Sequence, residues 1–292
     1  MTGAERGWLL LCADLGDGLT PLTLPQVRVL RSAVRAREMP GEPQRELSAP
    51  DLRTMGYSDD EAERILRLLD RDRVLDDYLA LAAEFGIRPI TRLSPEYPAR
   101  LLRLGSEAPA ILFFRGDPAC LAGPFVALVG SRKLTPEGKR FARRVGILAA
   151  AEGYTLVSGN AAGADRTAQN ACLEAGGKVL SILPDSLRDY RPVKNRGLLS
   201  EQAWHLPFTA HRALRRNLLI HAMGEVTIAA QTGTSGGTWN GCVENLKRNL
   251  SLVFVRRDGS PGAEDLISRG AEGLEEITGI SSLKGRMQRL PL

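Results

Sequence analysis

Short apolar segments alternate with amphipathic, glycine-bounded segments between residues 125 and 275. The apolar segments are predicted strands: Phe125–Val129, Tyr154–Val157, Lys178–Leu183, Val226–Ala230 and Leu252–Val255. The amphipathic segments are predicted helices: Pro136–Glu152, Ala164–Glu174, Ala213–Met223, Trp239–Arg248 and Ala263–Arg269. Because the strands are continuously apolar, both faces of their sheet must be covered by helices. The pattern therefore predicts an α/β fold with a doubly wound, mostly parallel, Rossmann-like sheet.

The region before residue 125 has a different sequence pattern. Residues 1–88 are predicted to be a helical domain, in which Ser58 and Glu61 form a capping box at the start of a helix over 59–69. The helix pair around Gly56 fits either a SAM-like or helix–hairpin–helix-like domain or a plain small helical domain. Residues 89–124 contain six prolines and one apolar strand, Ala110–Phe114, and are predicted to connect the two domains and pack on the second. Residues 276–292 form a tail without a strong pattern.

The composition sets outer limits on function. The 292 residues carry a net charge of +5, and the four cysteines lie far apart without a C-x-x-C pair. This spacing argues against a disulfide framework or a zinc ribbon and suits a reducing compartment. No uncharged apolar run approaches the roughly 18–20 residues of a membrane span. We therefore expect a cytoplasmic protein with no membrane partner.

Three strand-to-helix turns are rich in glycine and small polar residues. In a doubly wound sheet such turns lie at the carboxyl edge of the strands, where ligands bind. Each is expected to open a helix, so that backbone N–H groups point at an anion such as phosphate. Turn geometry alone is the alternative explanation of the glycines. The candidate binding residues in these turns are Gly130, Ser131, Arg132, Ser158, Gly159, Gly163, Asp165, Ser235, Gly236 and Gly237.

The stretch from Arg188 to Arg216 holds seven basic and two acidic residues, so it carries as much net charge as the whole chain. Because it begins soon after a predicted strand, we expect it over the same carboxyl edge as the glycine turns. A groove for a polyanion is the resulting hypothesis, and a solvated charged face is the alternative. Aromatic residues for base stacking lie in or near the stretch: Tyr190, Trp204, Phe208 and Trp239.

Several familiar chemistries lack their motifs. There is no G-x-G-x-x-G after the first strand and no Walker A sequence, which argues against NAD or ATP as a cofactor. The G-x-S-x-G match at 233–237 lacks a histidine after its serine, which a hydrolase triad on this fold requires. The three histidines, His205, His211 and His221, lack metal-ligand spacing. We expect no cofactor, no metal and no catalytic residues.

Taken in order, the motifs resemble those of the DNA-processing protein A (DprA/Smf) family. The matching residues are Tyr97-Pro98 with Leu101, Val129-Gly130-Ser131-Arg132, Ser158-Gly159 with Ala161, Gly163 and Asp165, Tyr190 with Asn195, Ser200-Glu201, Arg216-Asn217, Ser235-Gly236, and Gly262 with Leu266-Ile267 and Gly270-Ala271. Their order and approximate spacing hold over residues 90–275.

The resemblance implies an extended Rossmann-like fold that binds single-stranded DNA in a basic pocket. It implies a non-enzymatic, dimeric recombination mediator that protects incoming or exposed strands and helps to load a RecA-type recombinase. Arg132 would contact phosphate, Ser158, Gly159 and Gly163 would shape the pocket floor, and Asp165 would order its turn. Arg216 and Asn217 would line the other side, and Arg215 is a further candidate DNA- or phosphate-binding residue.

The chain also departs from the family pattern. Ala213, Leu218 and Gln169 replace an aromatic residue, an arginine and a histidine, and no winged helix follows residue 275. These differences indicate a divergent member, whose role could be transformation, repair or defence.

A second resemblance concerns the turn Gly236-Gly237-Thr238 and the later Glu244. It is similar to the lysine decarboxylase-like nucleotide phosphoribohydrolases, whose signature is PGG-x-GT-x-x-E. The alternative function is therefore a nucleotide-binding or nucleotide-cleaving enzyme that uses Glu244 and Arg132. A protein-binding scaffold is a third possibility.

Overall fold

The computed structural model describes residues 1–36 and 47–287. Residues 37–46 of the predicted helical domain and 288–292 of the predicted tail lie outside the described residues. The chain divides into two compact units. The first unit contains Met1–Tyr97 and Leu104–Leu112, and the second contains Pro98–Arg103 and Phe113–Leu292.

The first unit is helical, with one strand that belongs wholly to it. Its elements are α1 (Gly3–Cys12), α2 (Leu24–Ala36), α3 (Ala49–Thr54), α4 (Asp59–Leu69), α5 (Asp72–Glu84) and β1 (Ile87–Thr91). The capping box of Ser58 and Glu61 is confirmed at the start of α4. Helix α1 was not predicted. It is held by buried Arg71, which donates to the Leu10 and Ala13 carbonyls and pairs with Asp17.

The sheet of the second unit confirms the predicted fold class. Its strands are β2 (Ile111–Gly116), β3 (Phe125–Val129), β4 (Thr155–Ser158), β5 (Lys178–Ile182), β6 (Arg196–Ser200), β7 (Val226–Ala229), β8 (Leu252–Arg256) and β9 (Glu272–Leu274). They lie in the order β2-β6-β5-β4-β3-β7-β8-β9. The pairing of β2 with β6 is antiparallel, and the remaining pairs in this order are parallel.

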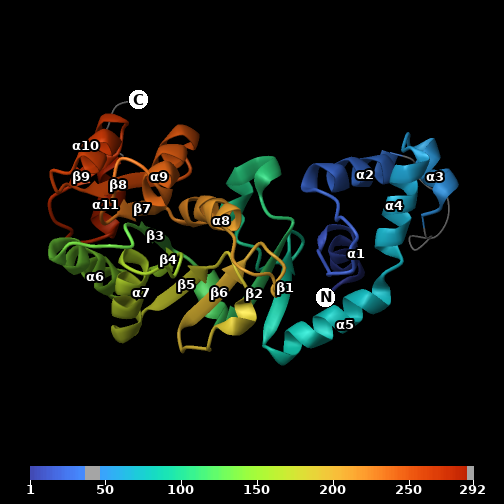
Figure 1. The fold of residues 1–292 in the computed structure, drawn as a ribbon, viewed down its shortest axis with the longest axis horizontal. Coiled ribbons are helices and arrows are strands. Elements are labelled where there is room, and N and C mark those ends of the chain that lie inside the picture. Colours follow the sequence, from blue (N-terminus) through green and yellow to red (C-terminus); the bar gives the residue numbers. More distant parts are fainter. Residues whose placement is uncertain (37–46, 288–292) are drawn as a thin grey trace. The chain divides into compact units, whose positions relative to one another are not determined.

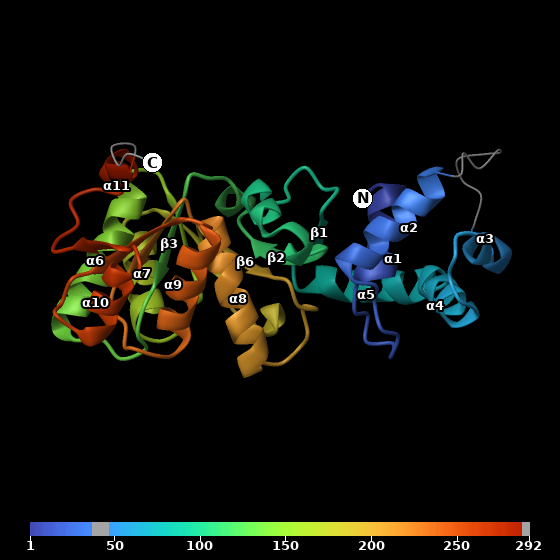
Figure 2. The same ribbon diagram turned by 90° about the horizontal axis from the view of Figure 1, so that it is seen from above.

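Helices cover both faces of this sheet (Figures 1 and 2). The helices of the second unit are α6 (Pro136–Ala151), α7 (Ala164–Glu174), α8 (Ala210–Met223), α9 (Gly237–Arg248), α10 (Pro261–Ser268) and α11 (Ser281–Met287), with 3-10 turns η1 (Ala99–Glu107, shared with the first unit), η2 (Pro118–Leu121) and η3 (Leu187–Asp189). In Figure 1, α6 and α7 lie together on one side of the strands, and α8, α9 and α10 lie on the other.

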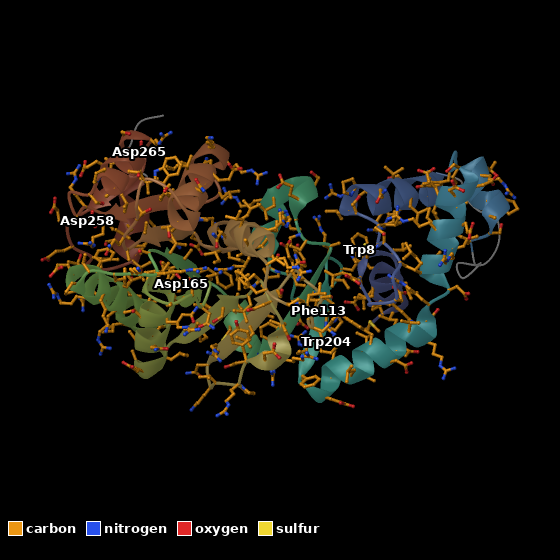
Figure 3. The ribbon with its side chains drawn as sticks, in the orientation of Figure 1. Trp8, Phe113, Asp165, Trp204, Asp258 and Asp265 are labelled. Carbon is orange, nitrogen blue, oxygen red and sulfur yellow. The ribbon has the colours of Figure 1, made fainter. Side chains whose placement is uncertain are left out.

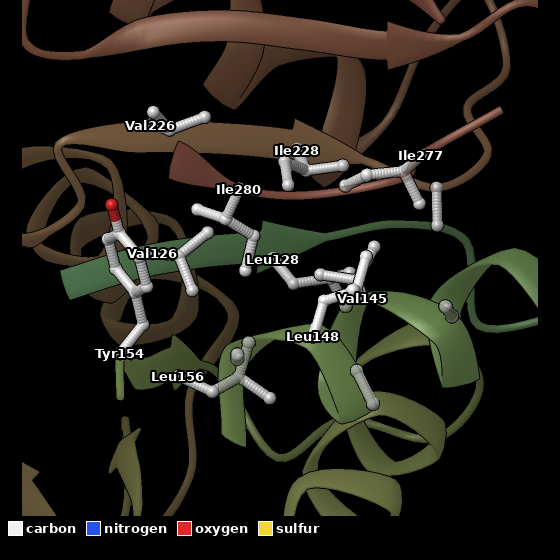
Figure 4. Packing of buried hydrophobic residues seen from close by; sticks show 14 of the residues in the cluster. Val126, Leu128, Val145, Leu148, Tyr154, Leu156, Val226, Ile228, Ile277 and Ile280 are labelled. Carbon is white, nitrogen blue, oxygen red and sulfur yellow. The ribbon is translucent and has the colours of Figure 1, made fainter. Parts of the chain in front are cut away.

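The core between the sheet and α6 is built from the alternating residues of the strands. Val126 and Leu128 of β3 face Val145 and Leu148 of α6 in a cluster of buried residues (Figure 4). The cluster also contains Ile280 and Leu283, which belong to the segment without a strong sequence pattern. Helix α11 is fixed there because Glu152 accepts hydrogen bonds from the backbone N–H groups of Ile280 and Ser281.

Strand β6 was not predicted, and its position corrects the expected course of the basic stretch. No α-helix separates β5 from β6, although the two strands are parallel. The segment between them must therefore return to the amino end of the sheet, where the Val179 N–H donates to the Asn195 carbonyl at 2.9 Å. The expectation that all of residues 188–216 lie over the carboxyl edge is thus wrong, because Asn195 and Arg196 lie at the opposite edge.

Replacement of Leu128 tests the core. Leu128 is fully buried in β3, so Leu128→Ala should lower the free energy of unfolding by about 2–5 kcal/mol through lost contacts and a cavity. Leu102→Ala is the control, because Leu102 is exposed and a surface change of this kind stays within about 0.5 kcal/mol. Chemical denaturation measures both, and equal losses for the two variants would contradict the assigned core.

Candidate functional site

Three loops meet where the strand order reverses. β3 lies between β4 and β7, while the helices that follow β3 and β7 cover opposite faces of the sheet. The crevice beyond the carboxyl ends of such strands is the usual ligand site of doubly wound folds. Hydrogen bonds join the loops: the Ser131 N–H donates to the Gln231 carbonyl at 2.9 Å, and the Ala164 N–H donates to the Ser131 carbonyl at 3.1 Å.

Two glycines allow the first and second loops to approach each other. A Cβ atom at Gly130 would lie 2.6 Å from the Cβ of Ala164. Gly163 has φ of +84°, and a Cβ atom there would lie 2.5 Å from the Arg132 carbonyl oxygen and would also overlap that of Ser131. Both positions therefore require glycine for close backbone packing, independently of any ligand.

The loops and one face of α8 enclose a cavity of about 570 Å³. Nine of the predicted site residues line it: Gly130, Ser131, Arg132, Asp165, Arg216, Asn217, Ser235, Gly236 and Gly237. Residues from four separate parts of the sequence are thus brought to one site, together with apolar side chains of α8 that were not predicted.

Four predicted residues lie behind this lining. Ser158 is buried at the end of β4, and Gly163 packs on the first loop. Gly159 lies directly beneath the guanidinium of Arg216, so closely that a Cβ atom would overlap it. Arg215 turns away and donates to both carboxylate oxygens of Glu201, each at 3.1 Å.

The three loops differ in the backbone N–H groups that they offer. At α6 the Thr135 hydroxyl caps the helix by accepting from the Gly138 N–H at 3.1 Å. In the second loop Asp165 (Figure 3) accepts from the Gly159 N–H at 3.1 Å and the Ala161 N–H at 3.2 Å. This is the turn-ordering role that the resemblance implied for Asp165. At α9 no side chain caps the helix, and Gly236 and Gly237 line the cavity. Helix α7 also lacks a side-chain cap, but its Ala164 and Arg166 N–H groups donate to the Ser131 and Ala161 carbonyls, so the start of α9 is the more open of the two.

A buried arginine faces the cavity. Arg216 is 7% exposed, and its Nη1 lies 4.0 Å from Oδ2 of Asp165. No described residue accepts a hydrogen bond from its Nε. Burial lowers the pKa of Arg216 and raises the pKa of Asp165, and the attraction between the two opposes both changes. An arginine remains charged under these conditions, so it supplies a desolvated positive charge with an unused donor.

The rim of the cavity is both cationic and apolar. Arg132 is exposed and forms no hydrogen bond or ion pair with a described residue. Phe208 and Leu214 also line the cavity, with 52% and 56% of their surface exposed.

The other three aromatic residues expected for base stacking do not line the cavity. Trp204 is buried in the core, while Tyr190 donates to Asp185 and Trp239 donates to Asp265 (labelled in Figure 3).

Several of the lining residues that sequence reasoning missed lie on α8, and others, such as Val129 and Thr232, lie at the strand ends and loops. Ala213, Asn217, Ile220 and His221 share a face of this helix because they are spaced by three or four residues. Because Asn217 was already a candidate, this helical spacing could have identified its neighbours on α8 as lining residues.

Within residues 1–36 and 47–287 there is no group of three or more His, Cys, Asp or Glu side chains that could hold a metal ion. None of the helices in the same part of the chain has the length and hydrophobicity of a membrane span.

Substitution of Gly163 tests the close approach of the first two loops. Gly153 has a similar φ of +74° but no atom within 4 Å of a built Cβ, so Gly153→Ala should cost only the backbone conformation, about 1–2 kcal/mol. Gly163→Ala adds the overlap with two carbonyl oxygens and should cost at least about 2 kcal/mol more. Thermal unfolding compares the two variants, and equal losses would show that the loops are further apart.

The buried imidazole of His221 makes stability depend on pH. Burial lowers its pKa from 6.5 to about 4. Between these values the unfolded chain binds a proton that the folded chain does not, so His221 destabilises the fold as the pH falls from about 6.5 towards 4. His221→Gln removes this titration. From pH 7 to pH 4.5 the wild type should therefore lose about 2–3 kcal/mol more of its free energy of unfolding than the variant, by chemical denaturation. An equal loss in both would contradict the lowered pKa.

Comparison with known proteins gives one family. The family model described as DNA recombination-mediator protein A matches residues 88–284, more than half of the chain. DNA processing protein DprA of Bacillus subtilis (strain 168) is 27% identical over 233 residues, which cover 73% of this chain and 76% of that protein. DNA processing protein DprA of Streptococcus pneumoniae (strain ATCC BAA-255 / R6) is 29% identical over 181 residues, which cover 57% of this chain and 64% of that protein.

Two solved structures are also similar. The X-ray structure of DNA processing protein A from Streptococcus pneumoniae has a TM-score of 0.71 at 22% identity and covers 100% of this chain and 99% of that chain, a likeness that concerns the fold. A structure of DNA processing protein A from Helicobacter pylori, described for its single-stranded DNA binding mode, has a TM-score of 0.59 at 25% identity. It covers 71% of this chain and 98% of that chain.

Proposed function

The chain belongs to the DNA recombination-mediator protein A family, and we propose that it binds single-stranded DNA at the cavity between the three loops and α8. In this proposal it protects incoming or exposed strands and helps to load a RecA-type recombinase on them. The Helicobacter pylori relative, described for single-stranded DNA binding, supports this choice of ligand.

The observation that carries the proposal is the convergence of two kinds of anion donor on one cavity. The uncapped start of α9 presents backbone N–H groups and the positive end of the helix dipole. Buried Arg216 adds a charge whose Nε has no acceptor among the described residues. A phosphate oxygen satisfies both, and low exposure strengthens the interaction because water competes less.

The rim supports a strand as ligand. Arg132 is exposed beside the first loop and is free to grip a second phosphate. Phe208 offers an exposed aromatic face at the same cavity, as single-strand binders use for base stacking. A polymer that crosses the cavity can use these rim groups as well as the buried donors.

We infer a homodimer that works in the cytoplasm without cofactor, metal or catalytic reaction, because the family resemblance implies this mode of action. The enzyme alternative required Glu244 at the site. Glu244 is instead absent from the cavity lining and pairs with Arg248 at 3.4 Å on α9.

Replacement of Arg132 tests the site. Arg132→Ala should weaken binding of a single-stranded oligonucleotide at least about tenfold, or ~1.4 kcal/mol, with little change in melting temperature. The slope of log affinity against log salt should fall by about 0.7, one phosphate contact. Arg132→Lys should recover part of the loss, since lysine cannot bind phosphate through two parallel hydrogen bonds.

Arg144→Ala is the matched control, because it removes an exposed arginine from the middle of α6 and should be near neutral. Wild-type affinity in folded Arg132→Ala at physiological salt would remove the first loop from the site. Steady release of base from nucleoside monophosphates by the wild-type protein would favour the enzyme alternative instead.

A further inference from the structure

His221 places a neutral polar group in the wall of the cavity. It belongs to α8, is 2% exposed and is one of the residues that line the cavity. Burial holds its pKa near 4, so the imidazole is uncharged at neutral pH. It differs in this respect from Arg132 and Arg216, which supply charge to the same cavity.

A buried hydrogen-bond network fixes which nitrogen of His221 carries the proton. The Ser251 N–H donates to Oδ1 of Asn245 at 2.9 Å, so the amide nitrogen of Asn245 must point the other way. That nitrogen lies 3.0 Å from Nδ1 of His221. The same nitrogen lies 2.8 Å from Oγ of Ser251, and an amide nitrogen only donates, so its two hydrogens go to these two nearest acceptors and Nδ1 accepts. A neutral imidazole that accepts at Nδ1 carries its proton on Nε2.

The Nε2–H group is directed at the side of α9. A Cβ atom at Gly241 would lie 2.6 Å from Nε2, so the ring nitrogen fits at this place only because Gly241 has no side chain. Among the described residues the structure gives Nε2 no hydrogen-bond acceptor. A donor without a protein partner gains a hydrogen bond when a ligand supplies an acceptor.

The spacing along α9 indicates which part of a ligand reaches His221. Asn217 lies beside Gly237, and His221, one turn further along α8, lies beside Gly241. Four residues of helix separate Gly237 from Gly241 by about 6 Å. A phosphate bound at the start of α9 therefore cannot also reach His221. Val129 and Ile220 give apolar lining to the same cavity, which suits a base better than a second phosphate.

We propose that the Nε2–H of His221 donates to a carbonyl oxygen of the nucleobase whose phosphate binds at the start of α9. The inference rests on the proposed function and adds a preference to it. Thymine, guanine and cytosine carry such an oxygen, whereas adenine has none. His221 thus disfavours adenine at this position of the strand.

Binding of three fluorescent oligodeoxynucleotides of equal length tests this: oligo(dT), oligo(dA) and an abasic strand. The wild type should prefer oligo(dT) to oligo(dA) by at least about fivefold, the scale of one hydrogen bond. His221→Met should lose this preference through weaker oligo(dT) binding alone. His221→Gln, which keeps an N–H donor near the position of Nε2, should restore part of it. His211→Met, at an exposed histidine of the same helix, is the matched control.

The outcomes separate the possible failures. An equal loss on all three strands, including the abasic one, would assign the acceptor to phosphate and overturn the base contact. Unchanged affinities in folded His221→Met would remove His221 from the site. A wild-type protein that binds none of the strands would overturn the proposed function and this inference with it. Without any DNA, long-range 1H–15N spectra should show His221 protonated at Nε2, and a proton on Nδ1 would contradict the network.

Discussion

The pair formed by Asp165 and Arg216 organises the site. Asp165 binds the Gly159 and Ala161 amides, which shapes the second loop, and its negative charge keeps Arg216 over Gly159. Both side chains are buried, so each charge depends on the other for compensation, and loss of one partner from such a pair typically costs about 3–5 kcal/mol. The conformation of the second loop and the positive charge in the cavity therefore depend on the same pair of side chains.

The sequence pattern correctly predicted those helices and strands whose own residues favour the structure that they adopt in the fold. Helix α7 was predicted with its observed ends, and β3 likewise, because each has continuous burial and clear glycine boundaries. Strand β6 was missed because Gly197 and Arg196 interrupt its apolar run, and its strand character comes from its neighbours on both sides. The predicted domain borders at residues 88, 124 and 275 remain predictions.

The site was predictable to the level of loops but less so for single side chains. Arg215 and Arg216 are adjacent, and both were candidates, yet one pairs with Glu201 and the other faces the cavity. About 100° of helix rotation separates them, and only the position of α8 on the sheet decides which one points inward. Trp204 shows the same limit, since composition cannot tell a stacking aromatic from a core one.

The division of the chain has a consequence for any attempt to take the protein apart. The backbone changes units after Tyr97, after Arg103 and again after Leu112. A single cut anywhere between these points leaves part of one unit attached to the other. Neither unit is therefore encoded by one uninterrupted stretch of gene, and a fragment made by simple truncation would carry an incomplete copy of at least one of them.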